Sequence, residues 1–208
     1  MGCMGGIGLC LAVWSENYLD FGLYLFFLST YHLLEYQYVM LFHPNELSSS
    51  SFMLRPNAHY KYAIGFSVVE YLVENSFFAW KRKAALVVVG VAMVVVGQVF
   101  RSGAMWTAGN NFHHLIRTQR VKGHQLITSG LYSFCRHPSY LGWFLWAVGT
   151  QVMLMNPISV VAWIVVLWRF FNDRIRFEEK TLIALFGDEY KEYQRRVPVR
   201  IPFIKTDL

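Results

Sequence analysis

Two side chains of opposite charge, Arg174 and Glu178, stand four residues apart in the second half of the chain. Residues at this spacing share one face of a helix. One interpretation is a surface ion pair, which contributes no more than about 1 kcal/mol to stability. The other is a cation and an anion directed into a pocket, where they bind ligand groups of opposite charge. The spacing alone is compatible with both.

The polar stretch from Asn110 to Pro138 contains four histidines, namely His113, His114, His124 and His137. A zinc site is not expected, because there is no His-Glu-x-x-His motif and no carboxylate accompanies His113 and His114. His124 and His137 are interpreted as hydrogen-bonding groups for a ligand or as interfacial residues. The sequence also lacks a P-loop and a Gly-x-Gly-x-x-Gly turn. A nucleotide-derived cofactor would therefore need a helical pocket.

Ionisable residues also occur inside apolar runs: Glu70 and Glu74 in one, His32 and Glu35 in another. Such residues are functional candidates by default, but they also join helices through buried polar contacts. We favour the structural interpretation, because the carboxylates lie too deep to meet a charged, water-borne substrate.

The three cysteines, Cys3, Cys10 and Cys135, are scattered and odd in number, so the sequence predicts no disulfide framework. Cys135 stands beside Arg136, whose charge could lower the thiol pKa. We interpret this cysteine instead as a small apolar filler.

Long apolar helices must position these groups. The chain has 208 residues, of which 55% are apolar and only 15% charged, which argues against an ordinary soluble domain and excludes a disordered one. A membrane-spanning helix needs about 20 mostly apolar residues, and the apolar runs are continuous rather than alternating, which excludes a β-barrel. The predicted spans are 21–42, 62–80, 84–100 and the shorter pair 140–155 and 158–171.

The predicted fold class is all-α: a polytopic helical integral membrane protein with a cytosolic C-terminal helical cap and no Rossmann domain. Asn156-Pro157 should form the turn of a helical hairpin over 140–171, and a helix should leave the bilayer near Asn172. We expect a transmembrane region over 1–105 and a catalytic region over 106–208 with a cofactor loop. The apolar stretch 4–14 is about half a span, so we read it as the end of an incomplete first span.

The formal charge of +6 favours an anionic membrane surface as partner over nucleic acid. Lysines and arginines concentrate on the cytosolic side of membrane proteins. Counting the connections in order predicts a cytosolic C-terminus, with Lys81, Arg82 and Lys83 as a conflicting cluster on the other side. The members of the larger group are Arg55, Lys61, Arg101, Arg117, Arg120, Lys122, Arg136 and the basic tail.

The segment from Arg136 to Trp146 carries an Arg-His-Pro-x-Tyr-x-Gly-x-x-x-Trp pattern. It resembles the motif of the isoprenylcysteine carboxyl methyltransferases. The resemblance extends upstream through Ala108–His113 and His124–Tyr132. It continues downstream through Trp168–Arg174, Glu178-Glu179, Phe186–Tyr193, Arg196-Val-Pro and Pro202-Phe-Ile.

This resemblance implies an endoplasmic-reticulum membrane enzyme that uses S-adenosylmethionine to methylate the C-terminal carboxylate of a prenylated cysteine in processed CaaX proteins. Arg174 is implied as the catalytic and substrate-binding residue that meets this carboxylate. The implied cofactor-binding residues are Arg117, His124, Gln125, Leu126, Ile127, Tyr132, His137, Pro138, Ser139, Tyr140 and Glu178. No metal is implied.

The chemistry agrees with that assignment. A carboxylate is already ionised at pH 7, so methyl transfer to it needs no general base and depends on positioning and electrostatics. Arg174 can hold the carboxylate bidentately, and Glu178 can bind the amino group of the methyl donor. Three alternatives remain at this point: an NADPH-dependent sterol reductase, a phospholipid N-methyltransferase, and a transporter or structural membrane protein.

Overall fold

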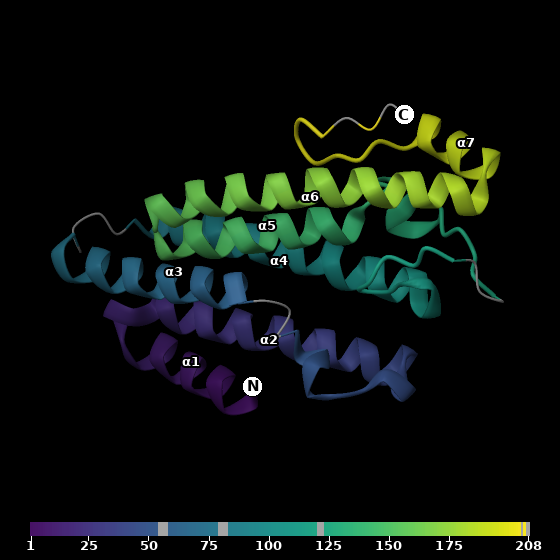
Figure 1. Cartoon of the computed structure of the whole chain (residues 1–208). Coiled ribbons are helices and arrows are strands. Elements are labelled where there is room, and N and C mark those ends of the chain that lie inside the picture. Colours follow the sequence, from purple (N-terminus) through teal and green to yellow (C-terminus); the bar gives the residue numbers. More distant parts are fainter. Residues whose placement is uncertain (54–57, 79–82, 120–122, 205, 207–208) are drawn as a thin grey trace. The chain divides into compact units, whose positions relative to one another are not determined.

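The computed structural model describes residues 1–53, 58–78, 83–119, 123–204 and 206. Within these residues the chain forms helices and no strand, as the sequence predicts (Figure 1). The α-helices are α1 (Gly2–Trp14), α2 (Leu19–Phe42), α3 (Ala58–Phe77), α4 (Ala84–Ala108), α5 (Pro138–Leu154), α6 (Pro157–Phe186) and α7 (Asp188–Arg196). Short 3-10 turns connect them, among them η2 (Pro44–Glu46), η3 (Ser49–Phe52), η5 (Gly109–Asn111) and η6 (Gly130–Ser133).

The described residues of the predicted apolar runs lie on helices, apart from Phe78 and Met155, which follow the ends of α3 and α5. Two helices extend well beyond their runs. α4 continues to Ala108, so that Arg101 lies within a helix rather than in a connection. α6 is one continuous helix of 30 residues, which carries the second arm of the predicted hairpin and the exit helix together. Among the described residues, one helical stretch, Ala84–Asn111, is long and apolar enough by itself to cross a membrane, and its most apolar part has a mean hydropathy of 2.2.

The chain divides into two compact units. Unit 1 comprises Met1–Val96 and Leu145–Ile164, and unit 2 comprises Gly97–Phe144 and Val165–Leu208. The unit boundaries fall inside α4, α5 and α6, so each of these helices contributes residues to both units. The predicted division into a transmembrane region 1–105 and a catalytic region 106–208 is one of function, not of compact units, and it stays a prediction.

In unit 1, α1 lies beside α2 (Figure 1), and Gly8 and Gly22 meet where the two helices cross. A β-carbon on either glycine would collide with the backbone of the other helix. Small residues at such crossings allow the close backbone approach on which packing between membrane helices depends.

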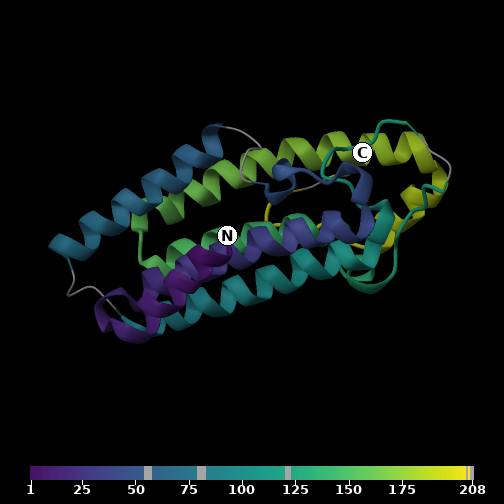
Figure 2. The same cartoon turned by 90° about the horizontal axis from the view of Figure 1, so that it is seen from below.

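α5 and α6 are joined by a short turn (Figure 2), and a polar cluster in unit 1 fixes the start of α6 after it. Glu70 of α3 accepts hydrogen bonds from the backbone amides of Ile158 at 2.7 Å and Ser159 at 2.8 Å. The Asn156 side-chain amide donates to the carbonyl of Ser67 at 2.8 Å. Glu70 thus caps the first turn of α6, where backbone N–H groups have no partner within the helix. These contacts support the structural interpretation of this carboxylate, which stays a prediction until the activity of a Glu70 variant is measured.

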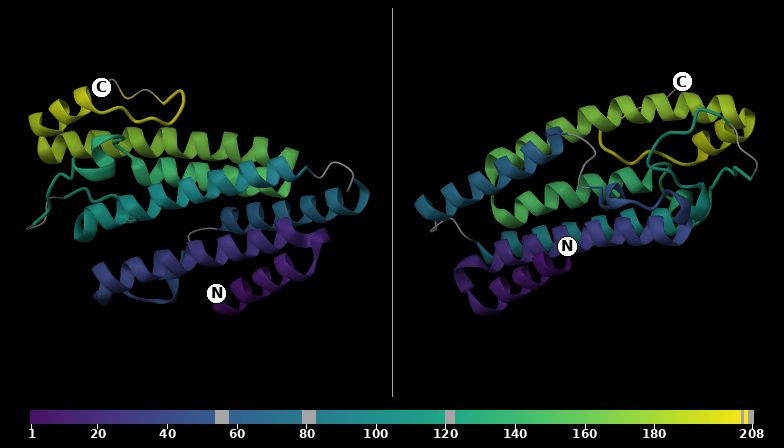
Figure 3. Two further views of the ribbon diagram at one scale, coloured as in Figure 1. Left: turned by 180° about the vertical axis from the view of Figure 1, so that it is seen from behind. Right: turned by 60° about the horizontal axis from the view of Figure 1, so that its bottom comes forward.

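Unit 2 contains the ends of α4 and α6, the start of α5, and α7. Gly142 of α5 lies against the backbone of α4, where a β-carbon would collide with Arg101. The buried Arg101 guanidinium donates to the Ser139 hydroxyl at 2.6 Å. The chain after α7 returns beside α6, where the Trp168 indole donates to the carbonyl of Pro202 at 2.9 Å (Figure 3).

Several sequence-based predictions fall on residues outside the described ranges. They concern the charges of Arg55, Lys81, Arg82, Arg120 and Lys122 and the end of the predicted 62–80 span.

Candidate active site

The Arg-His-Pro segment connects three parts of unit 2. The backbone amide of Arg136 donates to the carbonyl of Pro198 at 3.1 Å, which ties the segment to the chain after α7. Pro138 is the first residue of α5, a position where the missing N–H costs nothing. The motif therefore ends one irregular stretch and begins a helix at a fixed place.

Glu179 is fully buried and is the centre of a charged network. It accepts hydrogen bonds from Arg136 Nε at 2.8 Å, His137 Nε2 at 3.0 Å and Gln194 Nε2 at 2.9 Å. Burial alone would raise the pKa of Glu179, but the hydrogen bonds and charges of His137 and Arg136 outweigh it and lower that pKa. Glu179 is therefore ionised, and the Arg136 guanidinium stabilises the fold as its partner.

The Arg136 guanidinium also holds the C-terminal segment. Its Nη1 donates to the carbonyl of Gln194 at 2.8 Å and to that of Val197, and its Nη2 donates to the hydroxyl of Thr206. The Tyr193 hydroxyl adds a bond to the carbonyl of Tyr132 at 2.6 Å. The last part of the described chain is thus fixed to the segment that precedes α5.

A second chain of contacts begins at His137. Its ring stacks on that of Tyr140 with centroids 5.5 Å apart and an interplanar angle of 2°. The Tyr140 hydroxyl donates to Glu178 Oε2 at 2.6 Å and accepts from Arg174 Nε at 2.8 Å. Arg174 and Glu178 therefore share one helix face, as their spacing predicts, and meet through Tyr140. The interpretation as an isolated surface ion pair is wrong.

A cavity in unit 2 opens beside this chain of contacts. Its wall is formed by the end of α4, residues between 111 and 117, residues 124–127, the start of α5, and the facing parts of α6 and α7. All eleven residues predicted to bind a cofactor lie on this wall: Arg117, His124, Gln125, Leu126, Ile127, Tyr132, His137, Pro138, Ser139, Tyr140 and Glu178. Arg174 is not part of the described wall and reaches it through the Tyr140 hydroxyl.

Two tyrosines of α7 that the sequence assigned no role also line the cavity, Tyr190 and Tyr193. They are three residues apart and pack with Leu182 and Phe186 of α6. Burial raises the pKa of Tyr190, and within the described chain its buried hydroxyl has no hydrogen-bond partner. The i, i+3 spacing of two tyrosines on a charged helix was the signal that could have placed them on an inward face.

Two hydrogen bonds hold described residues between α4 and η6 in place. The Gln125 amide donates to Asn111 Oδ1 at 2.9 Å, and Arg174 Nη2 donates to the carbonyl of His114 at 2.6 Å. The predicted ligand-binding histidine His124 packs edge-on against Phe186 with ring centroids 5.1 Å apart.

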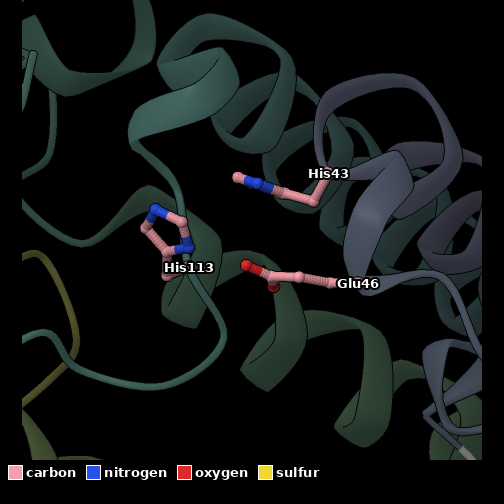
Figure 4. Close-up of side chains that lie close together, drawn as sticks. All are labelled: His43, Glu46 and His113. Atoms are coloured by element: carbon pink, nitrogen blue, oxygen red, sulfur yellow. The ribbon is translucent and has the colours of Figure 1, made fainter.

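Figure 4 labels three side chains of types that bind metal ions: His113 after η5, and His43 and Glu46 after α2. His113 belongs to unit 2, while His43 and Glu46 belong to unit 1, where the Glu46 amide donates to the His43 carbonyl at 2.9 Å. The expectation that the chain binds no zinc stays a prediction.

Cys135 is buried and donates through Sγ to the carbonyl of Val199 at 2.8 Å. Burial raises the pKa of this thiol to about 11. The neighbouring Arg136 does not produce a reactive thiolate, which supports the interpretation of Cys135 as a filler.

Comparison with known proteins decides the family. The family model for isoprenylcysteine carboxyl methyltransferases matches residues 88–184. A protein-S-isoprenylcysteine O-methyltransferase from Mus musculus is 43% identical over 99% of this chain and 73% of its own length. The chain belongs to the isoprenylcysteine carboxyl methyltransferase family.

Further relatives agree with this family assignment. An enzyme of the same name from Saccharomyces cerevisiae is 44% identical over 95% of this chain and 86% of its own length. A solved structure described as the eukaryotic intramembrane Ras methyltransferase superposes with a TM-score of 0.94 at 36% identity, covering 98% of this chain and 74% of that one. The predicted all-α integral membrane fold is that of the isoprenylcysteine carboxyl methyltransferases.

Proposed function

We propose that the chain methylates the C-terminal carboxylate of a prenylated cysteine in processed CaaX proteins, with S-adenosylmethionine as methyl donor. The observation that carries this proposal is the contact of Arg174 and Glu178 with one hydroxyl on the cavity wall, that of Tyr140. This arrangement offers a cation for an acidic substrate and an anion for a cationic donor within one pocket. The sterol reductase and phospholipid N-methyltransferase alternatives find no support among the relatives named above.

The cavity wall fits a methyl donor of this kind. Its buried Tyr190 hydroxyl, without a protein partner among the described residues, calls for a ligand or water. Glu178 is a carboxylate with a side chain 24% exposed, suited to an ammonium group, and Phe186, His124 and Tyr132 supply ring faces for an aromatic base or a cationic centre. We therefore propose that the eleven wall residues bind S-adenosylmethionine, which supplies an electrophilic methyl group when bound.

The residues of the chain then act by position. Arg174 would hold the substrate carboxylate and orient one of its oxygens toward the donor's methyl group, and because a carboxylate is already ionised the chain would need no residue to move a proton. Arg174 Nε and Nη2 are already engaged by Tyr140 and the His114 carbonyl. Nη1 makes no hydrogen bond within the described chain and Nη2 keeps its second N–H, so enough donors remain for a bidentate contact with the carboxylate.

Location follows from the same proposal. We infer an endoplasmic-reticulum membrane protein whose pocket opens to the cytosol, where the water-soluble donor is available. The prenyl chain requires apolar surroundings, which lipid between the spans supplies. The substrate would then enter sideways from the bilayer.

The test uses purified protein with labelled S-adenosylmethionine and a prenylated cysteine analogue. We expect a base-labile methyl ester, and we expect Arg174→Ala to reduce its formation by at least about 100-fold, because a charged hydrogen bond to the nucleophile is lost. Arg176→Ala on the same helix is the matched control, since Arg176 is exposed and bonds to Asn172 at 3.3 Å. Near-normal ester formation by Arg174→Ala would exclude Arg174 from the mechanism.

A further inference from the structure

The Tyr140 hydroxyl lies between two charges that would otherwise attract each other directly. Arg174 and Glu178 are at i and i+4 on α6, a spacing at which arginine and glutamate form ion pairs. In the described part of the chain they form no direct ion pair; each contacts the Tyr140 oxygen instead, at 2.8 Å and 2.6 Å. The hydroxyl of a different helix thus occupies the place where the ion pair would form.

In these two hydrogen bonds the donor and the acceptor are fixed by the chemistry of the groups. A guanidinium only donates, so Tyr140 must accept from Arg174, and its single proton must then go to Glu178. The ring stacks on that of His137 at 5.5 Å and on that of Phe171 at 5.1 Å between centroids. Rotation of the hydroxyl away from the two charges is therefore restricted.

The arrangement leaves one polar atom of each charged group available for a ligand. Among the described residues, Arg174 Nη1 and Glu178 Oε1 have no hydrogen-bond partner, whereas Nε, Nη2 and Oε2 are engaged. A direct ion pair between the two side chains would occupy at least one of these atoms. Neutralised charges would also attract ligand groups of opposite sign less strongly.

Tyr140 already lies on the wall proposed to bind the methyl donor. We propose that its hydroxyl has a second, positioning role: it separates Arg174 from Glu178 and so keeps both available for ligands. The inference rests on the proposed function, in which Arg174 takes the prenylcysteine carboxylate and Glu178 the methyl donor. Removal of the hydroxyl should let the two side chains pair directly. Both ligands should then bind more weakly, although Tyr140 need not bond to the substrate.

The test is Tyr140→Phe, which keeps the stacked ring and removes only the hydroxyl. We expect the KM for the prenylcysteine analogue and the Kd for S-adenosylhomocysteine each to rise by about tenfold or more, in line with the loss of charged hydrogen bonds. Tyr71→Phe is the matched control, because its hydroxyl makes a similar buried bond to Asp20 at 2.9 Å in unit 1. That variant should leave both constants unchanged.

A second comparison separates charge separation from a general loss of structure. In a Glu178→Gln background Arg174 has no carboxylate with which to pair, so Tyr140→Phe should change the KM for prenylcysteine by less than about threefold. Equal penalties in both backgrounds, or single-variant constants within twofold of the parent protein, would overturn the inference. A parent protein that neither binds S-adenosylhomocysteine nor forms the ester would instead overturn the proposed function.

Discussion

Glu178 and Glu179 are neighbours in sequence with separate tasks. Glu178 lies on the cavity wall, so Glu178→Ala should raise the Kd for S-adenosylhomocysteine by about tenfold or more, because a charged hydrogen-bond acceptor is lost. Isothermal titration calorimetry on the purified protein measures this. The melting temperature should change little, since the side chain is partly exposed. An unchanged Kd would remove Glu178 from the donor site.

Glu179, by contrast, should control stability and its dependence on pH. Glu179→Gln should lower the free energy of unfolding by about 3–5 kcal/mol, because the buried Arg136 charge loses its partner. The lowered pKa means that the stabilisation by Glu179 is present above the ordinary carboxyl value of 4.5 and is lost as the pH falls through the lower folded value.

Thermal unfolding between pH 7 and pH 3 tests both statements. The melting temperature of the parent protein should fall on acidification, whereas that of Glu179→Gln should start lower and vary less. Glu189→Gln on α7 changes an exposed carboxylate and is the control. Parallel pH curves for the parent and the Glu179 variant would contradict the assignment.

For single residues, sequence patterns predicted which side chains lie together but not which of them bind ligands and which stabilise the fold. The spacing of Arg174 and Glu178 predicted a shared face, and the motif placed His137 to Tyr140 at the site. The role of Arg136 as a structural tie depends on carbonyls of Gln194 and Val197, about 60 residues away. No local pattern encodes such a contact, because it arises only when the C-terminal segment returns.

At the scale of elements, apolar runs predicted helices because a continuous apolar stretch can satisfy its backbone only internally in a bilayer. They did not predict the ends. α4 and α6 continue past their apolar stretches because polar partners, such as Ser139 for Arg101 and Tyr140 for Arg174, lie where the helices continue. The hydropathy of a helix does not reveal the tertiary contacts that extend it, because these depend on residues elsewhere in the chain.

The Glu70 cap of α6 provides a prediction at this scale. A glutamine has one acceptor oxygen, while Glu70 accepts from two backbone amides and the Ser159 hydroxyl. Glu70→Gln should therefore lower the free energy of unfolding by about 1–3 kcal/mol with ester formation per folded molecule unchanged. Glu46→Gln, an exposed carboxylate in the same unit, is the comparison. A collapse of activity at an unchanged melting temperature would show that Glu70 acts in catalysis.

At the scale of the whole molecule, the structure changes the basis of the predicted orientation. Two arginines counted toward the cytosolic side, Arg101 and Arg136, are buried and bound to Ser139 and Glu179, so they do not face headgroups. The remaining bias in the described chain rests on exposed cations such as Arg117, Arg195 and Arg196. Two of these arginines lie on α7, so the predicted orientation depends mainly on cations near the C-terminal end of the described chain.

The orientation is tested with a C-terminal epitope tag in sealed endoplasmic-reticulum vesicles, whose outer face is the cytosolic one. Anionic lipid at that face attracts exposed lysine and arginine, so external protease should remove the tag without detergent. A neutral variant of the tail, Arg195→Gln with Arg196→Gln, should reduce the fraction that is cleaved if this charge sets the orientation. A tag that is protected until detergent is added would reverse the orientation and place the cavity on the lumenal side, away from the cytosolic methyl donor.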